Sequence, residues 1–178
     1  MKTLVIYDSQ FGNTERLAEV IARQLGADTP VWAADGAAKA ALELGDWDLL
    51  IIGAPTQHQT VSPTMRALLQ GAPGAALKHA HVAVFDTRYR MTRLLSGSAA
   101  DWIATRVARA GAVLLVAPES FFVERETPPP GEQRRHDHVH DQIHDHERLE
   151  AGEEERALAW ASALVANEAP TPQSVMRS

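Results

Sequence analysis

The chain contains no cysteine, so disulfides, thiolate catalysis and cysteine-ligated metal or iron–sulfur sites are excluded. Aromatic residues make up only 6% of its 178 residues. No apolar run reaches the ~18 residues that a membrane-spanning helix needs. The first residues also lack a charged leader followed by a long apolar segment, which favours a cytoplasmic location without membrane contact.

The composition is that of a globular protein with a modest excess of acidic residues. Hydrophobic residues make up 45% of the chain, and 23 acidic against 17 basic residues give a net charge of −6. This charge disfavours a general nucleic-acid-binding role, because affinity for phosphate backbones depends on clustered Lys and Arg. The length suits one domain with a substantial core.

Short apolar runs alternate with helical patterns along the chain. The apolar runs predict buried strands at 4–7, 29–33, 48–53, 81–85 and 112–117. Apolar residues at helical spacing predict helices at 15–25, 36–44, 63–69, 98–110 and 153–166. Ser96 or Ser98 is the expected cap of the fourth helix. This alternation predicts an α/β fold in which helices cover both faces of a five-stranded parallel sheet, and such sheets bind ligands at the carboxyl ends of their strands.

Two segments depart from the alternation. Residues 127–150 begin with three prolines and a glycine and then become rich in His, Asp, Arg and Glu, which indicates an insertion or a long loop. Residues 168–178 are polar and contain two prolines, which is typical of a flexible tail. We therefore predict a single domain over residues 1–167 that carries a His-rich insertion.

The insertion gathers five histidines between His136 and His146. Every fourth residue would share a face on a helix, and every second residue would do so on a strand. Either arrangement offers imidazole nitrogens to Zn²⁺, Ni²⁺ or Cu²⁺, although no metal ligand set is fixed by the spacing. A solvated loop that becomes protonated near pH ~6.5 is the alternative. Val139 and Ile143 also allow a short amphipathic helix that docks on the domain or on a second subunit, as in a homodimer.

The most informative feature is the polar loop after the first predicted strand, Ser9-Gln10-Phe11-Gly12-Asn13-Thr14. Hydroxyls, an amide and backbone N–H groups gather there at a helix N-terminus, where the helix dipole favours an anion. Gly12 permits a tight turn and close approach of the anion. The loop holds no Lys or Arg, so neutral dipoles would carry the binding. An ordinary strand–helix turn capped by Asn13 or Thr14 is the alternative.

Residues 9–14 resemble the phosphate loop of the flavodoxin family, Thr/Ser-x-Thr-Gly-x-Thr. The chain matches most of this motif, but Phe11 stands where the family often has Thr or Tyr, which removes one hydroxyl and leaves the backbone donors. The resemblance covers about residues 1–123 and 151–166. It implies a flavodoxin-like three-layer sandwich with strand order 2-1-3-4-5. It also implies that the phosphate of FMN is held by Ser9, Gln10, Phe11, Gly12, Asn13 and Thr14.

The same resemblance implies that the loops after the third and fourth strands contact the isoalloxazine ring of FMN. Pro55 and Thr56 match the usual start of the first of these loops. His58 would partly replace a Trp that often stacks on the ring there, and a solvent-exposed histidine is the alternative. In the second loop, residues 86–90, Tyr89 is the expected stacking residue, unless it packs over the sheet edge. Asp86 and Thr87 stand where contacts to the ribityl chain or the pyrimidine could form. The FMN-binding residues implied in these two loops are Pro55, Thr56, Gln57, His58, Asp86, Thr87, Arg88 and Tyr89.

Charged residues of the second loop would tune the flavin. Asp86 is expected at the mouth of the site, where its charge would disfavour a reduced flavin anion. Arg88 and Arg90 would have the opposite effect or would meet an acidic partner. No general base or nucleophile with partners is evident, so no catalytic residue is identified.

The resemblance implies a non-covalent FMN-binding protein that transfers electrons to a redox partner protein or a small electron acceptor. An FMN-dependent NAD(P)H:quinone-type oxidoreductase on the same fold is one alternative. A His-rich metal-binding module, or a flavin-free binding module, is another. A phospho-receiver domain is disfavoured because the third predicted strand ends at Ile52-Gly53, where such a site needs an acidic residue.

Overall fold

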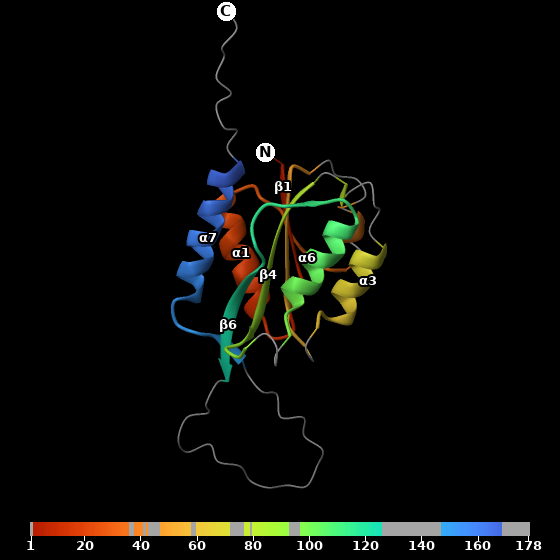
Figure 1. The fold of residues 1–178 in the computed structure, drawn as a ribbon. Helices are drawn as coiled ribbons and strands as arrows, with labels where there is room; N and C mark the ends of the chain where they lie inside the picture. Colours follow the sequence, from red (N-terminus) through yellow and green to blue (C-terminus); the bar gives the residue numbers. More distant parts are fainter. Residues whose placement is uncertain are drawn as a thin grey trace, which may run out of the picture.

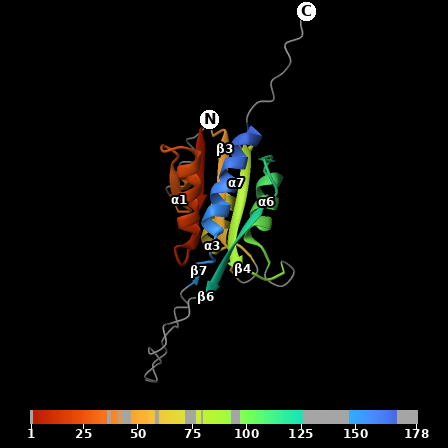
Figure 2. The same cartoon turned by 90° about the vertical axis from the view of Figure 1, so that its left-hand side faces the viewer.

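In the part of the chain that the structure describes, one sheet lies between two layers of helices (Figure 1). The computed structural model describes residues 2–35, 38–40, 42, 47–57, 60–71, 77–78, 80–92, 97–125 and 147–168. Helices α1 (Asn13–Leu25) and α7 (Glu153–Glu168) cover one face of the sheet, and α3 (Pro63–Gly71) and α6 (Ala99–Arg109) cover the other. The view from the side of α1 and α7 shows both helices lying along the strands (Figure 2). The predicted α/β class and its three layers are confirmed.

The sheet is parallel except at one edge. Its strands are β1 (Thr3–Tyr7), β2 (Val31–Ala33), β3 (Leu49–Pro55), β4 (His81–Tyr89), β5 (Val113–Leu114), β6 (Glu119–Arg125) and β7 (Glu147–Leu149). The order is β2-β1-β3-β4-β6-β7, and β5 pairs with the start of β4. This order contains the predicted 2-1-3-4-5 when β5 and β6 together count as the fifth strand. The antiparallel strand β7 was not predicted.

The central strands could be predicted from the sequence because their residues are buried. Residues Leu49 to Ala54 of β3 are all buried, because β1 and β4 flank this strand and helices cover both of its faces. Helix α1 buries Leu17 and Ile21, which lie one turn apart on the face that meets the sheet. Trp160 of α7 packs edge-on against the rings of Phe85 and Phe121, each with ring centroids 6.1 Å away. These contacts close the core on the α1–α7 side.

The fifth predicted strand, 112–117, was misplaced. Only Val113 and Leu114 pair with β4 there, and Val113 is 48% exposed. The principal fifth strand is β6, which pairs with β4 from Phe85↔Glu119 to Tyr89↔Val123. Phe121 of β6 is fully buried, and the burial of its ring stabilises this strand although both of its ends are polar.

The fourth strand is longer than the sequence indicates. It was predicted to end at Phe85, with a loop at 86–90, but β4 continues to Tyr89. The extension is stable because both neighbours pair with it: Ala54↔Asp86 on β3 and Asp86↔Ser120 on β6. The prediction that residues 86–90 form a loop is therefore wrong for Asp86 to Tyr89, which belong to β4, and only Arg90 lies beyond the strand.

Strand β7 ends the segment that was predicted as an insertion. Arg125 of β6 pairs with Glu147, so the two described ends of this segment lie side by side. The His-rich residues 136–146 lie outside the described residues, as do most of the predicted helix 36–44 and residues 169–178. The domain limits and the flexible tail remain predictions.

Candidate functional site

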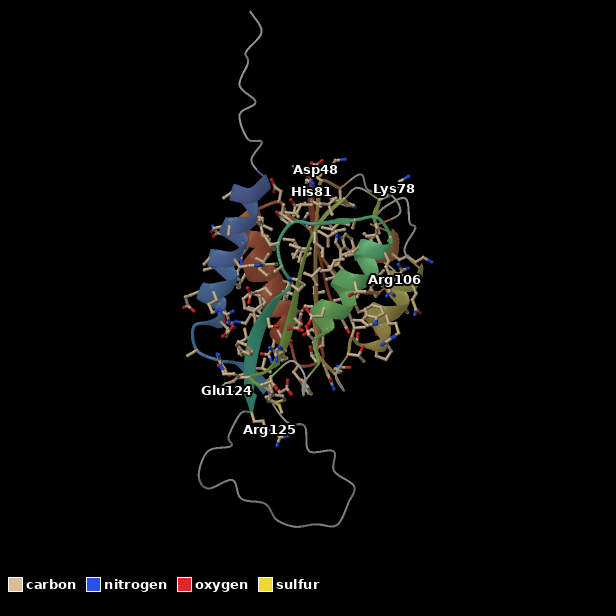
Figure 3. The ribbon with its side chains drawn as sticks, in the orientation of Figure 1. Asp48, Lys78, His81, Arg106, Glu124 and Arg125 are labelled. Carbon is tan, nitrogen blue, oxygen red and sulfur yellow. The ribbon has the colours of Figure 1, made fainter. Side chains whose placement is uncertain are left out.

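The candidate site lies at the edge of the sheet where the parallel strands end. Figure 3 places Glu124 and Arg125, at the end of β6, opposite Asp48 and His81, which stand before or at the starts of β3 and β4. Because β1, β3, β4 and β6 are parallel, the loop after β1 and the residues after β3 reach the same edge. Parallel sheets of this kind bind ligands at this edge.

The loop of residues 9–14 leaves the start of α1 open. Gly12 is the N-cap residue, has a left-handed backbone (φ 85°), and supplies no side-chain cap. A Cβ at Gly12 would meet nothing within 4 Å among the described residues, so these leave the backbone there uncovered. The alternative of a turn capped by Asn13 or Thr14 is therefore wrong. The first N–H groups of α1 have no intrahelical acceptor and remain able to bind an anion.

The hydroxyls of Ser9 and Thr14 in this loop have different roles. The N–H of Gly12 donates to Ser9 Oγ at 3.0 Å, which closes the turn and leaves the Ser9 proton as a donor. Thr14 is only 1% exposed, and its hydroxyl shares a hydrogen bond of 2.8 Å with that of Thr87. Thr14 thus holds the loop on the sheet, and Ser9 is the better placed hydroxyl for a ligand.

The residues after β3 are tied to the same edge. Thr56 N donates to the carbonyl oxygen of Thr87 at 2.9 Å, so the chain leaves the sheet in a fixed direction. Gln57 Nε2 donates to Gln10 Oε1 at 2.6 Å, which brings the second predicted loop against the first. Pro55 is the last residue of β3. His58 lies outside the described residues, so its contact with a ring remains a prediction.

Asp86 does not lie at the mouth of the site. Its side chain is 0% exposed, because it sits within β4 and beneath the start of α6. Its Oδ2 accepts hydrogen bonds from Thr56 and Ser98 hydroxyls and from the N–H of Ala100. Its Oδ1 has no hydrogen-bond partner among the described residues. The expectation that Asp86 lies at the mouth, where its charge would act directly on a flavin, is wrong for this reason.

Arg88 is likewise internal. It is 7% exposed and donates from Nε to Ser120 Oγ (3.1 Å) and from Nη1 to the carbonyl of Met91 (2.7 Å). Arg90, by contrast, is exposed and forms an ion pair with Glu150 at 2.7 Å. Arg88 was expected, with Arg90, to act on the flavin or to meet an acidic partner; its side chain instead folds back onto β6, where it is buried.

Tyr89 stands at the end of β4 and is half-buried. Its hydroxyl donates to Glu147 Oε1 at 2.6 Å. Burial, followed by this hydrogen bond, raises the pKa of Tyr89 above its ordinary value, so the phenol stays protonated at neutral pH. Its stacking on a ring remains a prediction.

Glu147 was missed by the sequence reasoning. Besides binding Tyr89, its carbonyl accepts a hydrogen bond of 3.0 Å from Asn13 Nδ2. One residue of β7 thus contacts both the loop after β1 and the end of β4. No local sequence pattern indicates this role, because Glu147 lies 134 positions from Asn13.

A pocket of about 470 Å³ lies beside the end of β4. Its lining combines cationic, acidic and apolar side chains from Tyr89, Arg90, Met91, Val123, Glu124, Arg125 and Glu150. The described residues contain no group of three His, Asp or Glu side chains that could hold a metal ion. None of the helices described is long and apolar enough to cross a membrane.

The chain is similar to flavodoxins in sequence and in structure. Residues 4–94, more than half of the chain, match the family model described as a flavodoxin domain. No curated protein sequence matches the chain. A flavodoxin from the domain Archaea has a similar structure, with a TM-score of 0.68, 16% identity, and coverage of 93% of this chain and 97% of that one.

Two bacterial structures are also similar. Flavodoxin 1 from Bacillus cereus has a TM-score of 0.65 and 16% identity, and the match covers 93% of this chain and 98% of that one. A flavodoxin, WrbA-like protein from Agrobacterium tumefaciens has a TM-score of 0.63 and 18% identity, with coverage of 92% and 94%. At such low identity these similarities show the fold alone.

Proposed function

Since the chain belongs to the flavodoxin family, we propose that it binds FMN non-covalently and carries electrons to a redox partner protein or a small electron acceptor. Proteins of this family bind a flavin, usually FMN, and transfer electrons. When bound, FMN would supply the redox chemistry, and the protein would bind, orient and tune it. A cytoplasmic location and a homodimer remain predictions.

The open N-terminus of α1 is the observation that carries the proposal. The N–H groups there, the left-handed Gly12 and the free proton of Ser9 form a cradle of donors for a phosphate. No cation lies within the loop, and Glu147 is close through Asn13, so the binding would depend on short N–H hydrogen bonds. These donors fit a phosphate.

The ring would be held by residues that follow β3 and by the residue that ends β4. Pro55, Thr56, Gln57 and His58 would contact one side of it, and Tyr89 would offer its half-buried ring on the other. Gln57 is already bonded to Gln10, so the phosphate loop and the ring loop are positioned together. The buried Asp86, Thr87 and Arg88 are removed from this set of direct contacts because their polar atoms face protein partners.

Titration with FMN and with riboflavin tests the proposal. Riboflavin keeps the ring and lacks the phosphate, so the phosphate cradle should make the Kd for FMN lower by about 100-fold or more, given several charge-assisted hydrogen bonds. Quenching of flavin fluorescence measures both constants. Ser9→Ala should weaken FMN and leave riboflavin unchanged, and Ser162→Ala, which removes an exposed hydroxyl of α7, serves as the matched control. Equal affinity for the two flavins, or none for either, would refute the proposal.

The pocket beside Tyr89 favours a second candidate function. An FMN-dependent NAD(P)H:quinone-type oxidoreductase needs room for a second substrate near the ring, and about 470 Å³ is available beside the end of β4. Oxidation of NAD(P)H in the presence of FMN and a quinone distinguishes this enzyme from a carrier. A carrier would bind FMN and show no turnover.

A further inference from the structure

Three consecutive residues of β4 are polar and buried inside the sheet. Asp86 is 0% exposed, Thr87 4% and Arg88 7%. A buried polar group is costly unless it is hydrogen-bonded, so partners are needed for each of these side chains. Their partners lie on the segments that follow β1, β3 and β4, and on the neighbouring strand β6.

Thr87 reaches the loop after β1. Its hydroxyl lies 2.8 Å from that of Thr14, in the first turn of α1. This first turn is directly joined to the open loop, because the N–H of Arg16 donates to the carbonyl of Gly12 at 2.9 Å. The hydrogen bond between the two threonines therefore holds the loop in one position relative to the sheet.

Asp86 reaches the residues after β3 and the start of α6. Its Oδ2 accepts from Thr56 at 3.0 Å, from Ser98 at 2.6 Å and from Ala100 N at 3.1 Å. Thr56 in turn accepts from Ala99 N at 2.9 Å. One carboxylate oxygen thus joins the exit from β3 to the helix that follows β4.

Arg88 reaches the chain immediately after β4 and the neighbouring strand. Its Nη1 donates to the carbonyl of Met91 at 2.7 Å, and its Nε donates to Ser120 at 3.1 Å. Its Nε also lies 3.9 Å from Asp86 Oδ1, so the two buried charges compensate each other.

We propose that Asp86, Thr87 and Arg88 form a polar brace of positioning residues that presets the loops of the ligand site. Each residue is assigned to a separate segment: Thr87 to the loop after β1, Asp86 to the exit from β3, and Arg88 to the exit from β4. A preset loop does not lose its freedom on binding, and this raises affinity without a direct contact. The nature of the ligand rests on the proposed function, whereas the effect on the loops does not.

Amide hydrogen exchange followed by NMR tests the brace in the protein without ligand. Thr87→Val keeps the shape of the side chain and removes the hydroxyl, and Thr87→Ser restores it. In Thr87→Val, exchange should rise roughly threefold to tenfold at the Gly12 and Arg16 amides, whose hydrogen bonds hold the loop and first turn. The amide of Met91, which donates to Tyr89, and that of Ile51 in β3 should be unaffected.

Arg88→Lys provides the reciprocal variant. It keeps the charge and loses the bond to the Met91 carbonyl, so exchange should rise at Met91 and stay unchanged at Gly12 and Arg16. Thr3→Val removes another buried threonine hydroxyl, at the amino edge of β1, and should change none of these amides. An unchanged Met91 amide in Arg88→Lys would overturn the assignment of Arg88 to the exit from β4. If this variant does not fold, the Gly12 and Arg16 amides of Thr87→Val decide whether a brace exists.

The outcomes separate a brace from general stabilisation. Faster exchange at all amides in Thr87→Val, or no change at Gly12 and Arg16, would overturn the proposal. Where the wild type binds FMN, Thr87→Val should raise the Kd about threefold to tenfold, Thr87→Ser should restore it, and Thr3→Val should leave it unchanged. A wild type that binds no FMN would refute the proposed function, and the exchange data would still decide the brace.

Discussion

Position 53 needs a glycine because a side chain there would clash with a residue of the neighbouring strand. Gly53 lies inside β3, opposite Phe85 of β4, and a Cβ there would be 2.1 Å from Phe85 Cζ. The ring of Phe85 packs against Phe121 and Trp160, so it has no room to move. The sequence suggested that Gly53 ended the strand, whereas the structure shows a strand interior with a close approach.

We expect Gly53→Ala to lower the free energy of unfolding by about 1–3 kcal/mol, because the methyl group would displace a packed aromatic ring. Urea unfolding followed by tryptophan fluorescence measures the change. Gly71→Ala is the matched control, since a Cβ at Gly71 would come no nearer than 3.9 Å to Lys39 Nζ. A loss for Gly53→Ala no greater than for Gly71→Ala would contradict this account of Phe85.

At the scale of elements, α6 depends on its first residues. Ser98 is the N-cap, as the sequence predicted, and its Oγ accepts from Asp101 N at 3.1 Å. The same hydroxyl donates to the buried Asp86 at 2.6 Å. The cap thus anchors the helix to the sheet as well as completing its first turn.

Ser98→Ala should therefore cost more than an isolated cap. We expect about 2 kcal/mol, at the upper end of the range for cap removal, because the buried carboxylate also loses a donor. Chemical denaturation gives the value. Ser162→Ala removes an exposed hydroxyl of α7 that donates to Leu158 and accepts from Gln24 of α1. Because both of these hydrogen bonds are exposed, its effect should stay within about 0.5 kcal/mol. A loss of no more than about 1 kcal/mol, the usual value for an isolated cap, would show that the contact with Asp86 adds nothing.

The elements that could be predicted are those whose burial is visible in their own residues. The continuous apolar run of β3 and the apolar stripe of α1 both depend on neighbours that cover them completely. The strand β6 could not be found in this way, since Glu119 and Arg125 end it and an apolar run at 113–116 precedes it. Pairing with β4, rather than composition, decides which of these two segments forms the longer strand.

Part of the candidate site could likewise be predicted from the sequence, and part could not. The open loop of residues 9–14 was predictable because a strand, a glycine and a helix start follow one another directly in sequence. Asp86 and Arg88 looked like loop residues because charged side chains are seldom buried. Their partners Ser98 and Ser120 are distant in sequence, and only the fold brings these groups together.

At the scale of the whole molecule, bound FMN should stabilise the folded chain by mass action. The loops after β1 and β3 come from separate parts of the sequence, so an unfolded chain would not assemble the site. At an FMN concentration 100 times the Kd, the free energy of unfolding should rise by about 2.7 kcal/mol.

Thermal unfolding at increasing FMN concentration measures this effect. The Tm should climb with the logarithm of FMN concentration above the Kd, and riboflavin should produce a smaller rise at the same concentration because it lacks the phosphate. A Tm that does not change at saturating FMN would indicate that the flavin also binds the unfolded chain or does not bind at all.

The two outer strands of the sheet have a consequence for how copies of the chain behave together. Both β2 and β7 are three residues long, Pro30 precedes the first, and the second carries Glu147 and Arg148. An exposed strand edge can recruit strands from other molecules, and short, proline-flanked or charged edges resist this. The described sheet therefore ends on both sides in strands that discourage fibril-like growth at high concentration.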